Sequence, residues 1–171
     1  REHHRFLLQQ LLDHLAYLDT QVGQFTARIE ELMRPFADEE LVEKLDAIPG
    51  VNITTVQNIL AEIGVDMSVF PTDSHLASWA GMCPGNEESA GKRKRRRITH
   101  GDRWLRRALA EAAWAASHTR DTYLASQYHR LAGRRGKKRA LIAVGHSLLV
   151  IIYHIIKYRL VYQDLGPDHF L

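Results

Sequence analysis

Residues 41–64 read LVEKLDAIPGVNITTVQNILAEIG, and this stretch predicts two short helices joined by a tight turn. Apolar residues recur three or four positions apart on both sides of Pro49-Gly50, which is the spacing of a buried helix face. The acidic residues at 38–40 favour a helix start, and Gly64 favours a helix end. No stretch of the chain shows convincing alternation of period two, so the predicted fold class is all-α.

A longer helix is predicted before this pair. Its apolar residues repeat with spacings of three and four: Leu8, Leu11, Leu15, Leu18, Val22, Phe25, Ile29, Leu32 and Phe36. A sustained 3.5-residue period is typical of coiled coils. Gly23 weakens the helix by about 1 kcal/mol relative to Ala, and Pro35 marks its end or a bend. We expect residues 1–37 to form a coiled-coil helix that pairs with another chain or with a second helix of the same protein. A long helix packed on its own domain is the alternative.

Residues 38–171 are predicted to form one helical domain. Beyond residue 64 we expect helices at 75–80, 101–117, 121–132 and 137–162, with the first capped by Asp73 or Ser74. Residues 81–91 have loop composition, and Gly133-Arg-Arg-Gly136 has that of a basic turn. The apolar run at 140–156 contains a glycine, a serine and two histidines, which suits a buried helix better than a membrane span. We therefore expect no membrane partner.

The single cysteine, Cys83, excludes an internal disulfide and fits a reducing cytosol. The ten histidines lack the short spacings of a metal site, and no nucleotide-binding glycine loop or set of carboxylates for two-metal chemistry is visible. His146 and His154 lie in an apolar stretch and are expected to be hydrogen-bonded core residues. The chain begins with Arg1, which indicates a fragment or a processed protein.

Charge is divided sharply along the chain. Residues 92–139 contain 16 of the 23 Lys and Arg but only three acidic residues, a net charge of +13. Residues 1–91 contain 5 basic and 15 acidic residues, a net charge of −10. Such asymmetry predicts a basic surface that meets a polyanion. An acidic membrane surface is a weaker candidate than nucleic acid, because the apolar residues near the cations look like core.

Three groups of cations are predicted to contact phosphates. The first is an unbroken run of six: Lys92, Arg93, Lys94, Arg95, Arg96 and Arg97. The second follows it, with its last two members on the next helix: Arg103, Arg106 and Arg107. The third surrounds a turn and opens the last helix: Arg134, Arg135, Lys137, Lys138 and Arg139. Cations at a helix start oppose the helix dipole, which suggests an external anion. A solvated surface is the alternative, and it is strongest for the third group.

The turn in residues 48–52 resembles a helix-hairpin-helix element. Such a turn leaves backbone N–H groups at the start of the second helix, and these bind a phosphate without reading a base. Gly50, Val51 and Asn52 are therefore candidate binding residues. Asn52 stands where a second glycine is common, and asparagine tolerates the left-handed backbone. An ordinary Pro-Gly turn between helices is the alternative.

Ser89 lies in a loop that leads into the six cations. A serine that attacks a phosphodiester needs exposure, close backbone approach and cations near the phosphorus. The loop offers the composition for all three, although most loop serines have no catalytic role.

Four blocks, in their order and spacing, resemble the C-terminal domain of the insertion-sequence one-ten family, with its one-sixteen and nine-oh-two relatives. They are Ile48-Pro-Gly-Val51, Leu76-Ala-Ser-Trp79-Ala-Gly81-Met-Cys-Pro84-Gly-Asn-Glu-Glu-Ser89-Ala-Gly91-Lys92, Trp104-Leu-Arg106 and Arg135-Gly-Lys-Lys-Arg-Ala140. The resemblance covers roughly residues 41–170, and the heptad helix before them also suits the family.

The resemblance implies a transposase that acts as a site-specific serine recombinase. In such proteins a guide RNA from the element directs recombination, and a serine of this domain becomes covalently attached to DNA; by motif that serine is Ser89. An N-terminal RuvC-like domain with four acidic residues binds Mg²⁺, and we expect that domain, and its metal, to be absent from these 171 residues. The chain alone is then expected to bind DNA or RNA without recombining it.

The same resemblance implies a homo-oligomer, a dimer or tetramer that associates through the N-terminal helix, in the bacterial cytoplasm at the nucleoid. The alternative function is a non-catalytic helix-hairpin-helix module for nucleic-acid binding and dimerisation.

Overall fold

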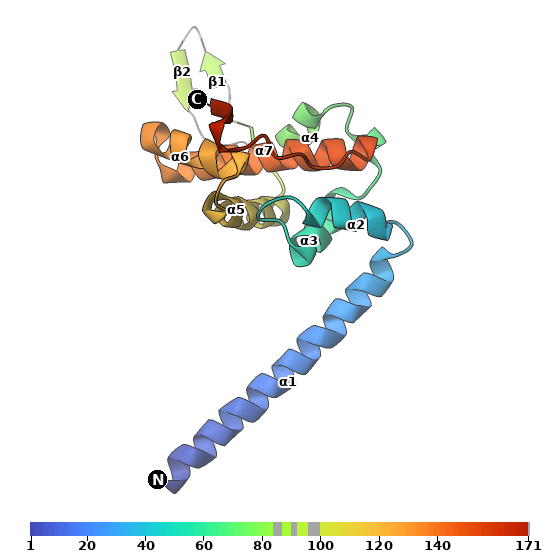
Figure 1. The fold of residues 1–171 in the computed structure, drawn as a ribbon, viewed down its shortest axis with the longest axis vertical. Helices are drawn as coiled ribbons and strands as arrows, with labels where there is room; N and C mark the ends of the chain where they lie inside the picture. Colours follow the sequence, from blue (N-terminus) through green and yellow to red (C-terminus); the bar gives the residue numbers. More distant parts are fainter. Residues whose placement is uncertain (84–86, 90–91, 96–99, 171) are drawn as a thin grey trace. The chain divides into compact units, whose positions relative to one another are not determined.

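The computed structural model describes residues 1–83 and 100–170, together with the backbone of 87–89 and 92–95. The chain divides into two compact units, Arg1–Ala37 and Asp38–Leu171. The predicted all-α class is confirmed: α-helices make up most of both units, and the described strands form one short hairpin (Figure 1).

The first unit is dominated by the helix α1, Glu2–Met33. It begins six residues before the first heptad position, and it ends just before Pro35, whose nitrogen has no hydrogen to donate. Gly23 lies inside the helix without a break in it. The heptad residues up to position 32 are between 42% and 68% exposed. The helix therefore carries an apolar stripe that its own unit leaves uncovered.

The second unit opens with α2, Glu39–Asp46, and α3, Ile53–Ile63. Side chains cap both helices: Asp38 accepts a hydrogen bond from Leu41 N at 2.8 Å, and Asn52 accepts one from Thr55 N at 2.9 Å. Gly64 ends α3 with a φ of +67°, as the sequence predicted.

The turn between α2 and α3 packs against the backbone of α5, Arg103–His118. Gly50 has a φ of +83°, and a Cβ added there would lie 2.8 Å from Ala116 Cα. It would lie closer still to the Ala116 nitrogen and the Ala112 carbonyl oxygen. Only glycine therefore allows this approach of turn and helix.

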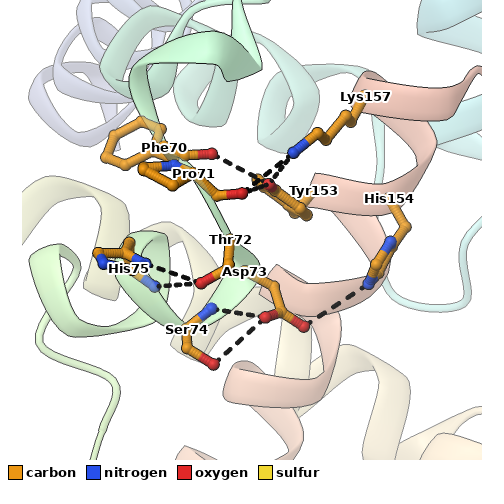
Figure 2. A network of polar contacts seen from close by, with 9 residues as sticks. All are labelled: Phe70, Pro71, Thr72, Asp73, Ser74, His75, Tyr153, His154 and Lys157. Atoms are coloured by element: carbon orange, nitrogen blue, oxygen red, sulfur yellow. Dashed lines mark hydrogen bonds and ion pairs between the residues drawn. The ribbon is translucent and has the colours of Figure 1, made fainter.

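A short 3₁₀ helix, Met67–Val69, leads to α4, Asp73–Trp79. The predicted cap was wrong by one residue, because Thr72 caps α4 and accepts a hydrogen bond from His75 N at 3.3 Å. Asp73 instead faces α7: its Oδ2 lies 3.6 Å from His154 Nε2, an ion pair when that histidine is protonated (Figure 2).

The segment before α4 is fastened to α7, Lys137–Tyr158, through a buried tyrosine. Tyr153 Oη lies 3.0 Å from the Phe70 carbonyl oxygen and 3.2 Å from that of Pro71, within donating distance of both. Lys157 Nζ donates to Tyr153 Oη at 2.6 Å and to the Pro71 oxygen at 3.2 Å (Figure 2). The hydrogen bond to Tyr153 is the main reason that the pKa of Lys157 is raised.

A two-stranded antiparallel hairpin follows α4, where the sequence predicted only a loop. Its strands are β1, Glu87–Ser89, and β2, Lys92–Arg95. The prediction failed because seven strand residues, rich in charge and interrupted by a register shift at residues 87 and 88, give no apolar alternation to detect.

The core of the second unit is built by α5, α6 (Tyr123–Arg135) and α7. α6 runs three residues past its predicted end, so Gly133 is helical and Gly136 alone, at φ +85°, separates α6 from α7. α7 ends at Tyr158 and not at 162, because Arg159 adopts a left-handed conformation. The buried α7 residues face the neighbouring helices: Ala140, Val144, Gly145, Leu148, Leu149, Ile152, Tyr153, Ile155 and Ile156.

α7 is long and apolar enough to cross a membrane by length and composition. Half of its most apolar window is buried inside the structure, and the helix packs against α4, α5 and α6. Both features are those of the core helix of a folded domain, which agrees with the prediction of a buried helix. The prediction that His146 and His154 are core residues was wrong, because both are only half-buried and both line an apolar groove. His154 Nε2 lies 3.6 Å from Asp73 Oδ2.

The C-terminal segment returns to α6 and ends in the 3₁₀ helix Pro167–Phe170. Asp164 fixes it by accepting hydrogen bonds from Tyr123 N, Gly166 N and Tyr162 Oη at 2.9, 2.7 and 2.7 Å. Burial raises the pKa of Asp164, but these three hydrogen bonds together outweigh burial and lower it. Asp164 thereby holds the segment against the first turn of α6.

Candidate functional site

The hairpin that carries Ser89 starts and ends at a contact between two glycines. A Cβ added to Gly101 would lie 2.5 Å from Gly81 Cα and nearer still to the Gly81 nitrogen. Gly81 itself has a φ of +68°. The backbone leaving α4 and the backbone entering α5 are therefore in direct contact, and this contact closes the base of the loop between them.

Met82 anchors the base of this loop in the core. Its side chain is 2% exposed, and its Cε would lie 2.7 Å from a Cβ placed on Gly145 in α7. The same added Cβ would lie 3.5 Å from the Leu109 carbonyl oxygen of α5. The loop is thus attached at a point where α5 and α7 approach closely. Sequence analysis missed these glycines, whose signal was their position on either side of the charged segment.

Ser89 is the last residue of β1, and its Cα lies opposite that of Lys92 in β2. The Cα register also places Glu88 opposite Arg93 and Glu87 opposite Arg95. The structure thus positions the backbone of the predicted nucleophile beside the start of the basic run. Arg96 and Arg97, the last two cations of that run, lie outside the described residues.

The second group of cations occupies the first turns of α5, directly after the base of the loop. Asp102 caps this helix by accepting a hydrogen bond from Leu105 N at 2.6 Å. The Arg103 guanidinium lies 4.5 Å from the centre of the exposed Trp104 ring. Arg107 donates to Glu111 at 2.9 Å, and this hydrogen bond raises the pKa of Arg107.

Arg106, the third cation of this group, is half-buried. Arg103 and Arg107 are exposed, and each already has an internal partner. A phosphate would therefore compete with Glu111 for Arg107 and would share Arg103 with an aromatic ring. Contact of these residues with phosphates remains a prediction.

The third group brackets Gly136. The last turn of α6 contains Arg134 and Arg135, and cations there are stabilised by the helix dipole. The first turn of α7 contains Lys137, Lys138 and Arg139, and cations there are destabilised by the helix dipole. All five side chains are exposed, and none forms an ion pair with an acidic side chain in the described ranges. The start of α7 also has no side-chain cap and no acidic residue in its first turn. This arrangement favours an external anion at the α6–α7 turn.

The α2–α3 turn has a structural role that the sequence did not reveal. Gly50 lies against α5. Val51 is buried, and its N–H donates to the Ile48 carbonyl oxygen at 3.0 Å. The Asn52 side-chain oxygen accepts hydrogen bonds from the backbone N–H and the hydroxyl of Thr55. Two helices joined by a tight turn are present as predicted. The conformations and contacts of Gly50, Val51 and Asn52 are, however, explained by packing and helix capping. Phosphate binding by this turn stays a prediction.

A metal site was not expected in this chain. Within the ranges that the structure describes, no three His, Cys, Asp or Glu residues are grouped so that they could hold a metal ion. The Mg²⁺ that the family resemblance implies therefore finds no fitting ligand set among the described residues. Burial raises the pKa of the half-buried Cys83 thiol beside the loop.

Comparison with known proteins places this arrangement in a family. Residues 42–130 match the family described as "Transposase IS116/IS110/IS902 family". The matched residues run from within α2 to within α6 and include the hairpin. A pilin gene-inverting protein of Moraxella bovis is 31% identical over 148 residues, covering 85% of this chain and 44% of that protein.

Two further relatives are named as insertion-element proteins. A 42 kDa protein of the insertion element IS900 from Mycobacterium paratuberculosis is 27% identical over 162 residues, covering 92% of this chain and 39% of the relative. A mini-circle putative transposase for IS117 from Streptomyces coelicolor is 30% identical over 150 residues, covering 81% of this chain and 36% of the relative. The chain thus spans less than half the length of these relatives, and it belongs to the IS116/IS110/IS902 family of transposases.

Proposed function

We propose that this chain is the DNA-handling and strand-joining part of an insertion-sequence transposase, in which Ser89 becomes covalently attached to DNA. One observation carries the proposal: the Ser89 backbone lies opposite Lys92, the first of six consecutive cations, on a loop closed at Gly81 and Gly101. A serine nucleophile needs this combination of loop backbone and neighbouring cations to approach a phosphodiester. The family membership supports DNA as the substrate, and the pilin gene-inverting relative suggests a reaction that breaks and rejoins strands.

The proposed reaction is a transesterification. Ser89 Oγ loses its proton to a general base and forms a bond to the phosphorus, while the bond from phosphorus to the leaving strand breaks. The leaving oxygen takes up a proton and becomes a free hydroxyl. One phosphoester replaces another, so rejoining needs no ATP. Arg95, Arg96, Arg97 and Arg106 would offset the charge that develops on the phosphorane.

The general base is proposed to come from outside this chain. The sequence shows no His–Asp pair around Ser89, and the family resemblance implies a RuvC-like domain, of the same or another subunit, that would supply a base or Mg²⁺. A guide RNA and a dimer or tetramer formed through α1 belong to the same proposal, as does action on the nucleoid in the cytoplasm. The exposed apolar stripe of α1 supports association.

Replacement of Ser89 tests the proposal directly. In the transposase that combines this chain with its RuvC-like domain, Ser89→Ala should keep DNA and RNA binding but abolish cleavage and the covalent protein–DNA adduct. Ser78→Ala is the matched control, because Ser78 is exposed on α4 and alanine suits a helix. Adduct formation on labelled DNA, followed by mass spectrometry of the attached peptide, is the measurement. An adduct at another residue, or recombination by Ser89→Ala, would show that the serine has no catalytic role.

The alternative is a non-catalytic module for nucleic-acid binding and dimerisation. The tight turn that joins α2 and α3, proposed as a helix-hairpin-helix element, supports this alternative together with the apolar stripe of α1. This alternative predicts that the transposase with intact Ser89 binds nucleic acid and self-associates but never forms an adduct.

A further inference from the structure

The turn from α5 to α6 forms one wall of an open pocket of about 850 Å³. The other walls are α6 as far as Arg130 and the C-terminal 3₁₀ helix. These two helices pack against each other (Figure 1). None of the cations in this pocket belongs to the three groups described above. The pocket therefore needs its own explanation.

Four histidine or arginine side chains line the pocket: His118, Arg120, His129 and Arg130. The Arg130 guanidinium is held 4.3 Å from the centre of the Phe170 ring, which in turn stacks on Tyr123 with centroids 5.1 Å apart. Within the part of the chain that the structure describes, neither Arg120 nor Arg130 forms an ion pair with an acidic side chain. Asp121 is the one acidic residue among the described lining residues, so the pocket carries net positive charge.

The hydroxyl groups of the pocket are already committed to the backbone. Ser126 Oγ donates to the Pro167 oxygen at 2.7 Å, and Thr122 Oγ1 donates to the Thr119 oxygen at 2.9 Å. His118 Nδ1 lies 2.8 Å from the Trp114 carbonyl oxygen. Because a carbonyl oxygen can only accept, Nδ1 is the nitrogen that carries the hydrogen in the neutral ring. The donors left for a ligand are the two guanidinium groups and the His129 imidazole, because Nε2 of a neutral His118 can only accept.

We infer that this pocket binds a phosphodiester group of a nucleic-acid strand, as a contact site separate from the hairpin and the α6–α7 turn. Planar guanidinium groups match phosphate oxygens in two-pronged hydrogen bonds, and a partly preorganised arginine loses less entropy on binding. Volumes of about 300–1,000 Å³ are typical of small-ligand sites, so the pocket has room for one nucleotide unit. The inference rests on the proposed function, because it takes the strand to be the DNA or RNA of the transposase.

Salt-dependent binding of the 171-residue chain tests the pocket. The variants are Arg120→Gln, Arg130→Gln and both together, with Arg28→Gln as the matched control, because Arg28 is also exposed but lies on α1 and pairs with Glu31. On duplex DNA the log–log slope should fall by about 0.9 for each phosphate that the variant no longer neutralises, and on single-stranded RNA by about 0.7. Because both arginines are proposed to contact one phosphodiester group, we expect the double variant to lose the slope of one phosphate and each single variant to lose no more than that, while the control keeps the original slope. The nucleic acid on which the slope falls identifies the strand.

Two outcomes would overturn the inference. Slopes for the double variant that equal those of Arg28→Gln on both nucleic acids would show that the pocket binds no phosphate. A chain without substitutions that binds neither nucleic acid would overturn the proposed function as well, so the two failures are distinguishable. Arg120→Gln is the variant least able to disturb folding, because Arg120 is exposed and its replacement removes no ring contact. Its Tm, measured by circular dichroism during thermal unfolding, should equal that of the chain without substitutions.

Discussion

Gly50 lies in the turn between α2 and α3, with its Cα against the backbone of α5. We predict that Gly50→Ala destabilises the chain by about 2–5 kcal/mol, because a φ of +83° strains an L-residue and the new Cβ overlaps backbone atoms of Ala112 and Ala116. Urea unfolding measures the change. Gly136→Ala is the control: its φ is +85°, but nothing lies within 4 Å of an added Cβ. Only the strain should remain there, about 1–3 kcal/mol. Equal destabilisation in the two variants would remove close packing as the reason for glycine at position 50.

The helix α1 shows how far an element can be predicted from its own residues. Its length, its apolar period and its end before Pro35 all follow from local sequence, whereas its partner does not. The stripe is about half exposed throughout, which is costly for so many apolar side chains in water.

We predict that the chain self-associates through this stripe. Leu11→Glu with Leu18→Glu should convert the oligomer to a monomer, because charges at core positions of a coiled coil are buried without partners. Gln10→Glu with Gln24→Glu adds the same charge beside the stripe and should leave the oligomer intact. Light scattering of both variants, and of the chain lacking residues 1–36, gives the mass. A monomeric chain without substitutions would rule out association through α1.

Across the whole molecule, the division of charge sets the expected binding behaviour. Residues 92–139 carry a net charge of +13, whereas residues 1–91 carry −10. Affinity for duplex DNA should fall with salt, because bound cations release counterions from the phosphates.

Replacement of Lys92–Arg97 with serine should flatten the log–log slope by several units, at about 0.9 for each phosphate that is no longer neutralised. The same exchange at Arg5 and Arg28, in the acidic part of the chain, should leave the slope unchanged. Preference for one base sequence should be weak in every variant, because backbone contacts position a protein without specifying sequence. Fluorescence anisotropy over a salt series provides the slopes, and an unaltered slope after the first exchange would remove the run from the interface.

The sequence by itself determined the features that depend on neighbouring residues: the all-α class, the heptad helix, the helix starts near Asp38 and Asn52, and the end of α3 at Gly64. It also marked Ser89 and the basic groups as candidates, through composition and family resemblance. The pairing of the strands around Ser89 was not predictable, because their residues carry charge in place of an apolar pattern.

Only the tertiary structure decided which distant residues meet. Gly50 touches α5, Gly81 touches Gly101, and Arg130 joins the C-terminal Phe170 to form a pocket wall. These contacts span 20 to 66 positions in the sequence, so no local propensity or periodicity encodes them. They arise because the buried faces of α5, α6 and α7 must pack together, and that packing fixes where the turns, the loop and the C-terminal segment lie.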